Sequence, residues 1–167
     1  MKTIHFVFGS QGAGKSTYAK QLAKEVNGVH LAIDEWMWEL FGADLPQPIN
    51  MAWVMERVAR CEKRIWANTL QIIATGTPAI LDLGFMKAQS RQLYNTLAAN
   101  LNIPVQWHYV DAPVETRLQR VINRNAEKGN TFSFEVSPEA FHFMESQFER
   151  PTEEELAKAL VISTHLP

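Results

Sequence analysis

Cysteine is nearly absent from this chain, and long runs of apolar residues are missing. Cys61 is the only cysteine among 167 residues, so no disulfide can form within the chain and nothing points to an oxidising compartment. The apolar run at 4–8 is too short for the core of a signal peptide. No run approaches the roughly 20 apolar residues that span a bilayer. We therefore expect a cytoplasmic protein with no membrane segment.

An excess of positive charge is also lacking. The formal net charge is −2, so no overall basic field attracts a polyanion, which argues against nucleic acid as a partner. The five histidines show no spacing typical of zinc ligands. The composition is globular, with 46% hydrophobic and 20% charged residues. We expect residues 1–167 to form one domain with a sizeable core.

Short apolar segments alternate with segments of helical periodicity. The apolar segments predict buried strands at 3–8, 29–33, 78–83, 105–110 and 159–164. Strands that are apolar nearly throughout and separated by helices are typical of a parallel sheet covered on both faces. The sequence therefore predicts an α/β protein with a three-layer α/β/α arrangement.

The intervening segments predict helices at 15–26, at 52–73 and from Pro113 to about 126. The buried stripe expected on the second of these helices consists of Val54, Val58, Cys61, Ile65 and Ile72. A four-residue repeat on a further helix consists of Leu93, Leu97 and Leu101. Ser137 is the expected N-cap of a helix that follows a polar loop at 127–136.

The segment GSQGAGKS, residues 9–16, follows the first predicted strand and opens the first predicted helix. This pattern is typical of a loop whose backbone N–H groups surround phosphates, since residues without a Cβ allow so tight a turn. Lys15 supplies a mobile positive charge for the terminal phosphates, and the Ser16 hydroxyl suits Mg²⁺. The residues expected to bind a nucleoside triphosphate are Gly9, Ser10, Gln11, Gly12, Ala13, Gly14, Lys15, Ser16 and Thr17.

Two carboxylates follow predicted strands, at the edge where such sheets bind ligands. Asp34 can accept the proton of a hydroxyl that attacks the terminal phosphate, although it or Glu35 could instead cap the next helix. Asp82 ends an apolar strand, which is the pattern of a carboxylate that holds Mg²⁺. The reverse assignment, with Asp82 as the base and Asp34 orienting the acceptor, stays open at this point.

Three arginines, Arg117, Arg120 and Arg124, share one face of a predicted helix that leads into the 127–136 loop. Arginines on a closing lid can neutralise the charge of a transferring phosphoryl group, and we favour this role for Arg120 and Arg124 over a merely solvated face. A second basic group is better explained as a solvated helix surface; its members are Arg57, Arg60, Lys63 and Arg64.

Taken in order along the chain, five stretches resemble the P-loop kinase group of small phosphotransferases. They are GSQGAGKST, DEW at Asp34, LDLGF, RVINRN and FERPTEEE. The resemblance is to zeta-toxin-like and chloramphenicol-phosphotransferase-like kinases, and to kinases of 5′-hydroxyl polynucleotide ends. It implies a five-stranded parallel sheet in the order 2-3-1-4-5, a short helical lid at about 120–140, and MgATP as phosphate donor.

The same resemblance implies roles for individual residues. Asp34 matches the catalytic aspartate of the group, Arg120 and Arg124 match lid arginines near adenine and the phosphates, and Arg91 faces the acceptor. The segment after Asp34 carries Trp36, Trp38 and Trp53, which together suggest an aromatic wall beside a small organic alcohol, although for any one of them a place in the core is the better explanation.

We therefore expect a monomeric or homodimeric ATP-dependent phosphotransferase acting on a small-molecule hydroxyl. A nucleotide or 5′-hydroxyl nucleic-acid kinase and a non-catalytic ATP-binding regulator are the alternatives.

Overall fold

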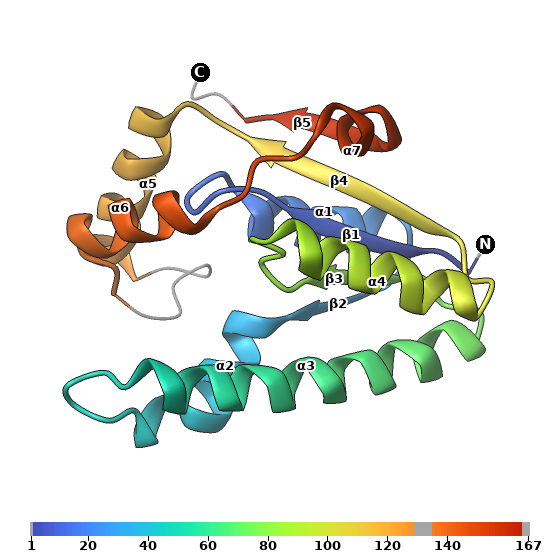
Figure 1. Cartoon of the computed structure of the whole chain (residues 1–167), viewed down its shortest axis with the longest axis horizontal. Coiled ribbons are helices and arrows are strands. Elements are labelled where there is room, and N and C mark those ends of the chain that lie inside the picture. The colour runs from blue at the N-terminus through green and yellow to red at the C-terminus, as the bar shows by residue number, and fades with distance from the viewer. Residues whose placement is uncertain (1, 129–134, 165–167) are drawn as a thin grey trace.

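A single parallel sheet forms the centre of the computed structural model, which describes residues 2–128 and 135–164. Its strands follow the order β2-β3-β1-β4-β5, which confirms the expected topology (Figure 1). The strands are β1 Ile4–Phe8, β2 Val29–Ala32, β3 Ala79–Asp82, β4 Val105–Asp111 and β5 Ala159–Ser163. Their bounds agree with the predicted ones to within a residue, because buried parallel strands are apolar on both faces.

Helices cover both faces of the sheet, so the predicted three-layer arrangement is confirmed. The helices are α1 Lys15–Glu25, α2 Ile33–Phe41, the 3-10 helix η1 Gly42–Asp44, α3 Met51–Ala74, α4 Ala88–Asn100, α5 Val114–Glu127, α6 Pro138–Gln147 and α7 Glu153–Lys158. Figure 1 shows α3 and α4 on one side of the sheet and α1 on the other. Among the described residues, no helix is both long and apolar enough to cross a membrane.

The alternation of side chains along β1 divides the core into two parts. Phe6 and Phe8 point to the α3 and α4 side, where Phe6 stacks on Trp107 with ring centroids 4.4 Å apart. Val7 points to the opposite side and packs with residues of α1. Both parts are closed to solvent, so β1 is fixed in the middle of the sheet and the loop that follows it has a rigid base.

All five strands run in the same direction, so their carboxyl ends meet at one edge of the sheet. Helices α5 and α6 stand at this edge in Figure 1. They pack on each other through Val121, Val136 and Phe141. The predicted lid at 120–140 includes these two helices, while residues 129–134 lie outside the described residues. Ser137 caps α6 as predicted, accepting a hydrogen bond from Ala140 N at 3.1 Å.

The buried faces of α3 and α4 include residues that the local sequence patterns did not single out. Leu93 in α4 and Leu101 directly after it are exposed, and the helix buries Arg91, Tyr94 and Ala98. Leu97, the middle residue of the four-residue repeat, packs against the core. Helix α3 buries Cys61 and Ile65 as predicted, but its stripe continues through Thr69 and Ile73.

Candidate functional site

The loop between β1 and α1 has the tight turns that its glycines predict. Gly12 and Gly14 have φ angles of 78° and 97°, a region in which other residues are strained. A Cβ at Gly12 would lie 2.5 Å from the Arg117 carbonyl oxygen. Gly14 is the N-cap of α1 and carries no capping side chain, so the first N–H groups of the helix stay available to an anion.

Arg117, on α5, contacts the backbone of this loop. Its guanidinium is fully buried and donates two hydrogen bonds to Glu145, at 2.6 and 2.8 Å. It also donates to the carbonyl oxygens of Ala112 and Gln11, at 2.9 and 3.3 Å. Arg117 therefore connects the loop to α5 and α6. The sequence favoured Arg120 and Arg124 over Arg117 for a role at the phosphates.

Arg120 contacts the loop from α5. Its guanidinium donates to the carbonyl oxygens of Gly12 and Ala13, at 3.4 and 3.2 Å. The same group donates to the hydroxyl and carbonyl oxygens of Thr164, at 2.9 and 3.0 Å, and the Thr164 hydroxyl bonds Ala13 O. The structure therefore brings Arg120 to the backbone of the predicted phosphate loop. The sequence offers no signal for the part that Thr164 takes, since 151 residues separate it from Ala13.

Lys15 lies over the loop, where its ammonium donates to the carbonyl oxygen of Ser10 at 3.1 Å. Burial lowers the pKa of the Lys15 ammonium, while the negative charges of Asp82 and Asp34 oppose that change. Two polar atoms of the loop, Ser10 Oγ and Gln11 Oε1, are buried with no hydrogen-bond partner among the described residues. The loop thus presents polar groups that the protein itself does not satisfy.

Ser16 and Asp82 meet at the first turn of α1. The Ser16 hydroxyl donates to Asp82 Oδ2 at 3.0 Å, and the Asp82 side chain is almost fully buried at the end of β3. A hydroxyl and a carboxylate oxygen fit Mg²⁺, which prefers oxygen ligands and keeps several waters. The part of the chain that the structure describes holds no group of three or more His, Cys, Asp or Glu residues able to form an all-protein metal cage.

Asp34 stands in the first turn of α2, directly after β2. The N-cap of this helix is Ala32 and no side chain caps it, so the interpretation of Asp34 or Glu35 as a cap is wrong. Solvent reaches the Asp34 side chain, yet the surrounding protein displaces part of its water. This loss of solvent and the charge of Asp82 raise the pKa of Asp34, while Lys15 and Arg124 act in the opposite direction.

Among the three arginines of α5, Arg124 is the one whose side chain has no hydrogen-bond partner within the described residues. Its Nε is buried without a partner, and within the described residues its guanidinium makes no hydrogen bond or ion pair. Burial lowers the pKa of Arg124, and the Asp34 carboxylate opposes that change. Arg124, Asp34 and Lys15 thus influence one another electrostatically from three different elements.

Arg91 does not reach the position that the sequence predicts. Its side chain is 1% exposed and donates to both carboxylate oxygens of Glu155, at 2.6 and 3.2 Å. It also donates to the carbonyl oxygen of Phe85 at 2.8 Å. These contacts join α4 to α7 inside the protein, so the structure does not bring Arg91 to an acceptor.

Trp38 lies four residues after Asp34 on α2, on the same side of the helix, and is half exposed. A hollow of about 240 Å³ is lined by Trp36, Glu39 and Leu40. At 100° per residue, these three residues lie on the side of α2 opposite to Asp34 and Trp38. The hollow is therefore not an acceptor pocket beside Asp34.

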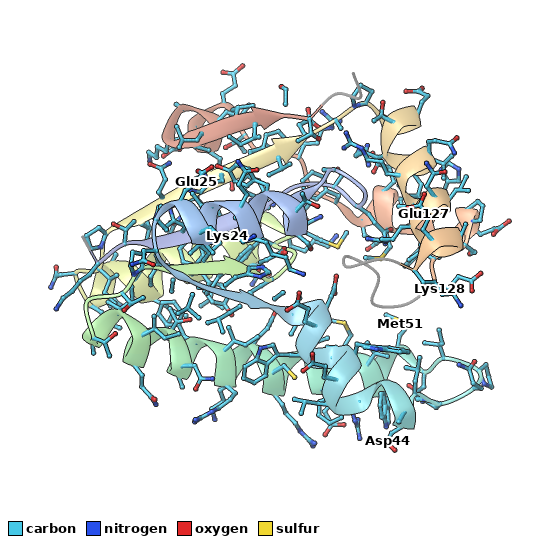
Figure 2. The ribbon with its side chains drawn as sticks, turned by 180° about the vertical axis from the view of Figure 1, so that it is seen from behind. Lys24, Glu25, Asp44, Met51, Glu127 and Lys128 are labelled. Atoms are coloured by element: carbon cyan, nitrogen blue, oxygen red, sulfur yellow. The ribbon has the colours of Figure 1, made fainter. Side chains whose placement is uncertain are left out.

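Figure 2 places the site from behind. Glu127 and Lys128 mark the end of α5, and Met51 marks the start of α3; both lie at the carboxyl edge of the sheet in this view. Lys24 and Glu25 mark the other end of α1 from the loop. The residues of the candidate site come from the first turns of α1 and α2 and from α5, as Lys15, Asp34 and Arg124 show.

Residues 4–151 match the family described as AAA domain, and the chain belongs to this family. No curated protein matches the sequence. The structure is similar to Kti12 of Chaetomium thermophilum in complex with ADP-AlF3, with a TM-score of 0.70, 14% identity, and coverage of 96% of this chain and 88% of that one.

Two solved kinases also share the fold. A gluconokinase from Sinorhizobium meliloti matches with a TM-score of 0.65 and 13% identity, over 99% of this chain and 85% of that chain. A sugar kinase from a Janibacter species matches with a TM-score of 0.61 and 16% identity, over 96% and 84%. The chain therefore has a P-loop kinase-like fold, as the resemblance in its sequence implied.

Proposed function

We propose that the protein is a phosphotransferase that moves the γ-phosphoryl group of MgATP to a hydroxyl group of a small molecule. The observation that carries this proposal is the arrangement of Lys15, Asp34 and Arg124 at the edge where the phosphate loop opens. A carboxylate that interacts electrostatically with two cations suits a reaction in which a hydroxyl loses a proton while negative charge moves between phosphate oxygens.

The contacts of the two aspartates support different roles for them. Asp82 is buried and bonded to Ser16, as a ligand of a nucleotide-bound cation would be. Asp34 is accessible to solvent, and no hydrogen bond or ion pair within the described residues holds its carboxylate. We assign Asp34 as the general base and Asp82, with Ser16, as the residues that would hold Mg²⁺.

In the proposed reaction the acceptor oxygen attacks the γ-phosphorus while its proton passes to the Asp34 carboxylate. The bond from the γ-phosphorus to the β–γ bridging oxygen breaks, and that oxygen leaves with ADP. Lys15 and Arg124 neutralise the charge on the phosphoryl oxygens, and the loop N–H groups hold the β-phosphate in line. Mg²⁺, when bound, supplies further neutralisation of phosphate charge.

The charge around Asp34 supports a small acceptor that is uncharged or cationic. Residues 26–55, which include Asp34 and the segment after it, contain no lysine or arginine, and the charge of Glu35 is already paired with Lys20. Arg91, which could have bound an acceptor phosphate, is paired with Glu155 in the interior. A nucleotide or polynucleotide acceptor would need cations at this place to bind its phosphates.

The test is transfer of label from γ-labelled ATP, with Mg²⁺, to separate pools of antibiotics, sugars, nucleosides, nucleotides and 5′-hydroxyl oligonucleotides. The wild type is compared with Asp34→Asn, and with Glu39→Gln as a matched change on the far side of α2. Label in a pool of small neutral or cationic alcohols, lost only in Asp34→Asn, supports the proposal. Label in the oligonucleotide pool would show that the acceptor is a nucleic-acid end and not a small molecule. Nucleotide binding with no labelled pool, and no difference between the variants, would favour a regulatory ATP-binding protein.

A further inference from the structure

His30 lies beside the candidate metal ligand and was not singled out by any sequence pattern. It is the second residue of β2, and the parallel register pairs His30 with Ile80 and Ala32 with Asp82 on β3. Since alternate residues of a strand share a face, the His30 and Asp82 side chains lie on the same face of neighbouring strands. That face is the one covered by α1, which carries Ser16.

The imidazole is buried and aimed at the carboxylate. Only 10% of the His30 side chain is exposed, and its Nε2 lies 3.6 Å from Asp82 Oδ2. This distance is just longer than a hydrogen bond, and Nε2 has no hydrogen-bond partner among the described residues. A buried polar atom without a partner is destabilising, so its presence here calls for an explanation.

We propose that His30 is a positioning residue, which donates from Nε2 to the Asp82 carboxylate when Mg²⁺ and nucleotide are bound. Oδ2 already accepts a hydrogen bond from Ser16. A second donor from β2 restrains the carboxylate against rotation and keeps it directed at the metal rather than at the acceptor. A small rotation of either side chain closes the remaining gap. This inference rests on the metal-binding part of the proposed function and is independent of the acceptor.

In metal sites generally, a residue that hydrogen-bonds to a metal ligand restrains the geometry of that ligand and tunes its affinity for the metal. His30 would act on Asp82 in this way. The neutral imidazole suffices, provided that its proton is on Nε2. With Asp82 held in this way, Asp34 is left as the carboxylate that can turn toward an acceptor. The two aspartates are then separated in role by their partners and not by their chemistry.

The test measures Mg²⁺-dependent binding of a fluorescent ATP analogue, which needs no acceptor and no turnover. His30→Leu removes the donor at similar volume, and His30→Gln keeps an N–H at about the reach of Nε2. His5→Leu is the control, since His5 lies on the same face of the sheet but bonds His108, outside the site. Urea unfolding of each variant reports its stability separately.

We expect His30→Leu to raise the Mg²⁺ concentration that gives half of the maximal increase in nucleotide binding by about 10-fold or more. Nucleotide affinity in EDTA should be unchanged. His30→Gln should recover most of the loss, and His5→Leu should match the wild type in Mg²⁺ dependence. An unchanged Mg²⁺ dependence in folded His30→Leu, or an equal loss with and without the metal, would overturn the inference. So would a wild type whose nucleotide binding ignores Mg²⁺. A protein that shows the expected Mg²⁺ shifts but labels no acceptor would refute the phosphotransferase proposal alone.

Discussion

Ser16 donates a hydrogen bond to Asp82 over 3.0 Å, joining the first turn of α1 to the last residue of β3. The two residues are 66 positions apart, and the sheet order that places β3 beside β1 makes them neighbours. Each residue was a candidate from its own local pattern. Their contact joins two separate candidates into one site, because a hydroxyl and a carboxylate that lie next to each other can both bind a hard cation.

The first prediction concerns this contact. Asp82→Asn should weaken Mg²⁺-dependent nucleotide binding on the order of 10- to 100-fold, because an amide oxygen carries no charge for the cation. Nucleotide binding in EDTA should change little. Titration of Mg²⁺ against a fluorescent ATP analogue measures both quantities. Asp44→Asn, an exposed change on η1, is the control and should leave both at wild-type values. Equal effects of the two substitutions would remove Asp82 from the metal site.

Lys15→Ala should lower the rate of phosphoryl transfer on the order of 10²- to 10³-fold, since the charge next to the terminal phosphates is lost. Lys24→Ala is the matched control, because Lys24 is an exposed lysine at the far end of the same helix (Figure 2). Initial rates with a labelled acceptor, measured for both variants, check the prediction. Near-normal transfer by Lys15→Ala would contradict the assignment of residues 9–16 as the phosphate loop.

Asp34 predicts a dependence of the rate on pH. Its pKa is raised above the ordinary value of 3.8, and the general base acts only when it is deprotonated. The rate should therefore fall as the pH falls through this raised pKa. Asp34→Asn should reduce the rate on the order of 10²- to 10⁴-fold, keep ATP affinity, and abolish that acidic limb. A profile of kcat against pH for both proteins provides the test; an acidic limb that persists in Asp34→Asn would assign it to another group.

Much of the fold follows from local patterns, whereas the detailed site does not. The strands and the phosphate loop could be predicted because each is specified by residues close in sequence, as the Phe6 to Gly14 segment illustrates. Arg91 could not be placed, because its partner Glu155 is 64 residues away and only the folded chain brings α7 against α4. His30 was missed for the same reason, since its proximity to Asp82 depends on strand register.

Because Arg91 is paired with Glu155, we expect substitution of Arg91 to lower the stability of the protein and not its catalytic rate. Arg91→Met should destabilise the protein by about 3 kcal/mol, because the Glu155 carboxylate loses its bidentate partner and the Phe85 carbonyl loses a donor. Arg60→Met breaks an exposed pair with Glu56 and should change stability by less than about 1 kcal/mol. Urea unfolding measures both effects. A raised acceptor KM in folded Arg91→Met, without lost stability, would restore Arg91 to the acceptor site.

A histidine network on the α1 side of the sheet predicts how stability depends on pH. His108 is 2% exposed, and its two ring nitrogens lie 3.0 Å from His5 Nδ1 and 2.8 Å from the Tyr18 hydroxyl. Burial, together with the nearby His5, lowers the pKa of His108 to about 4 from 6.5. The unfolded chain therefore binds a proton at a pH where the folded chain does not, so the free energy of unfolding should decrease as the pH falls from 6.5 toward 4.

The contribution of His108 to this decrease is up to about 3 kcal/mol, at 1.36 kcal/mol for each unit of pKa. His108→Gln removes the titrating ring, so its stability should change much less over the same interval even if it is lower throughout. His142→Gln changes an exposed ring on α6 and should retain the wild-type slope. Urea unfolding at several pH values between 4 and 7 compares the three proteins. If the free energy of unfolding fell equally with pH in all three proteins, groups other than His108 would cause the pH dependence. Removal of the His108 imidazole must otherwise remove its contribution.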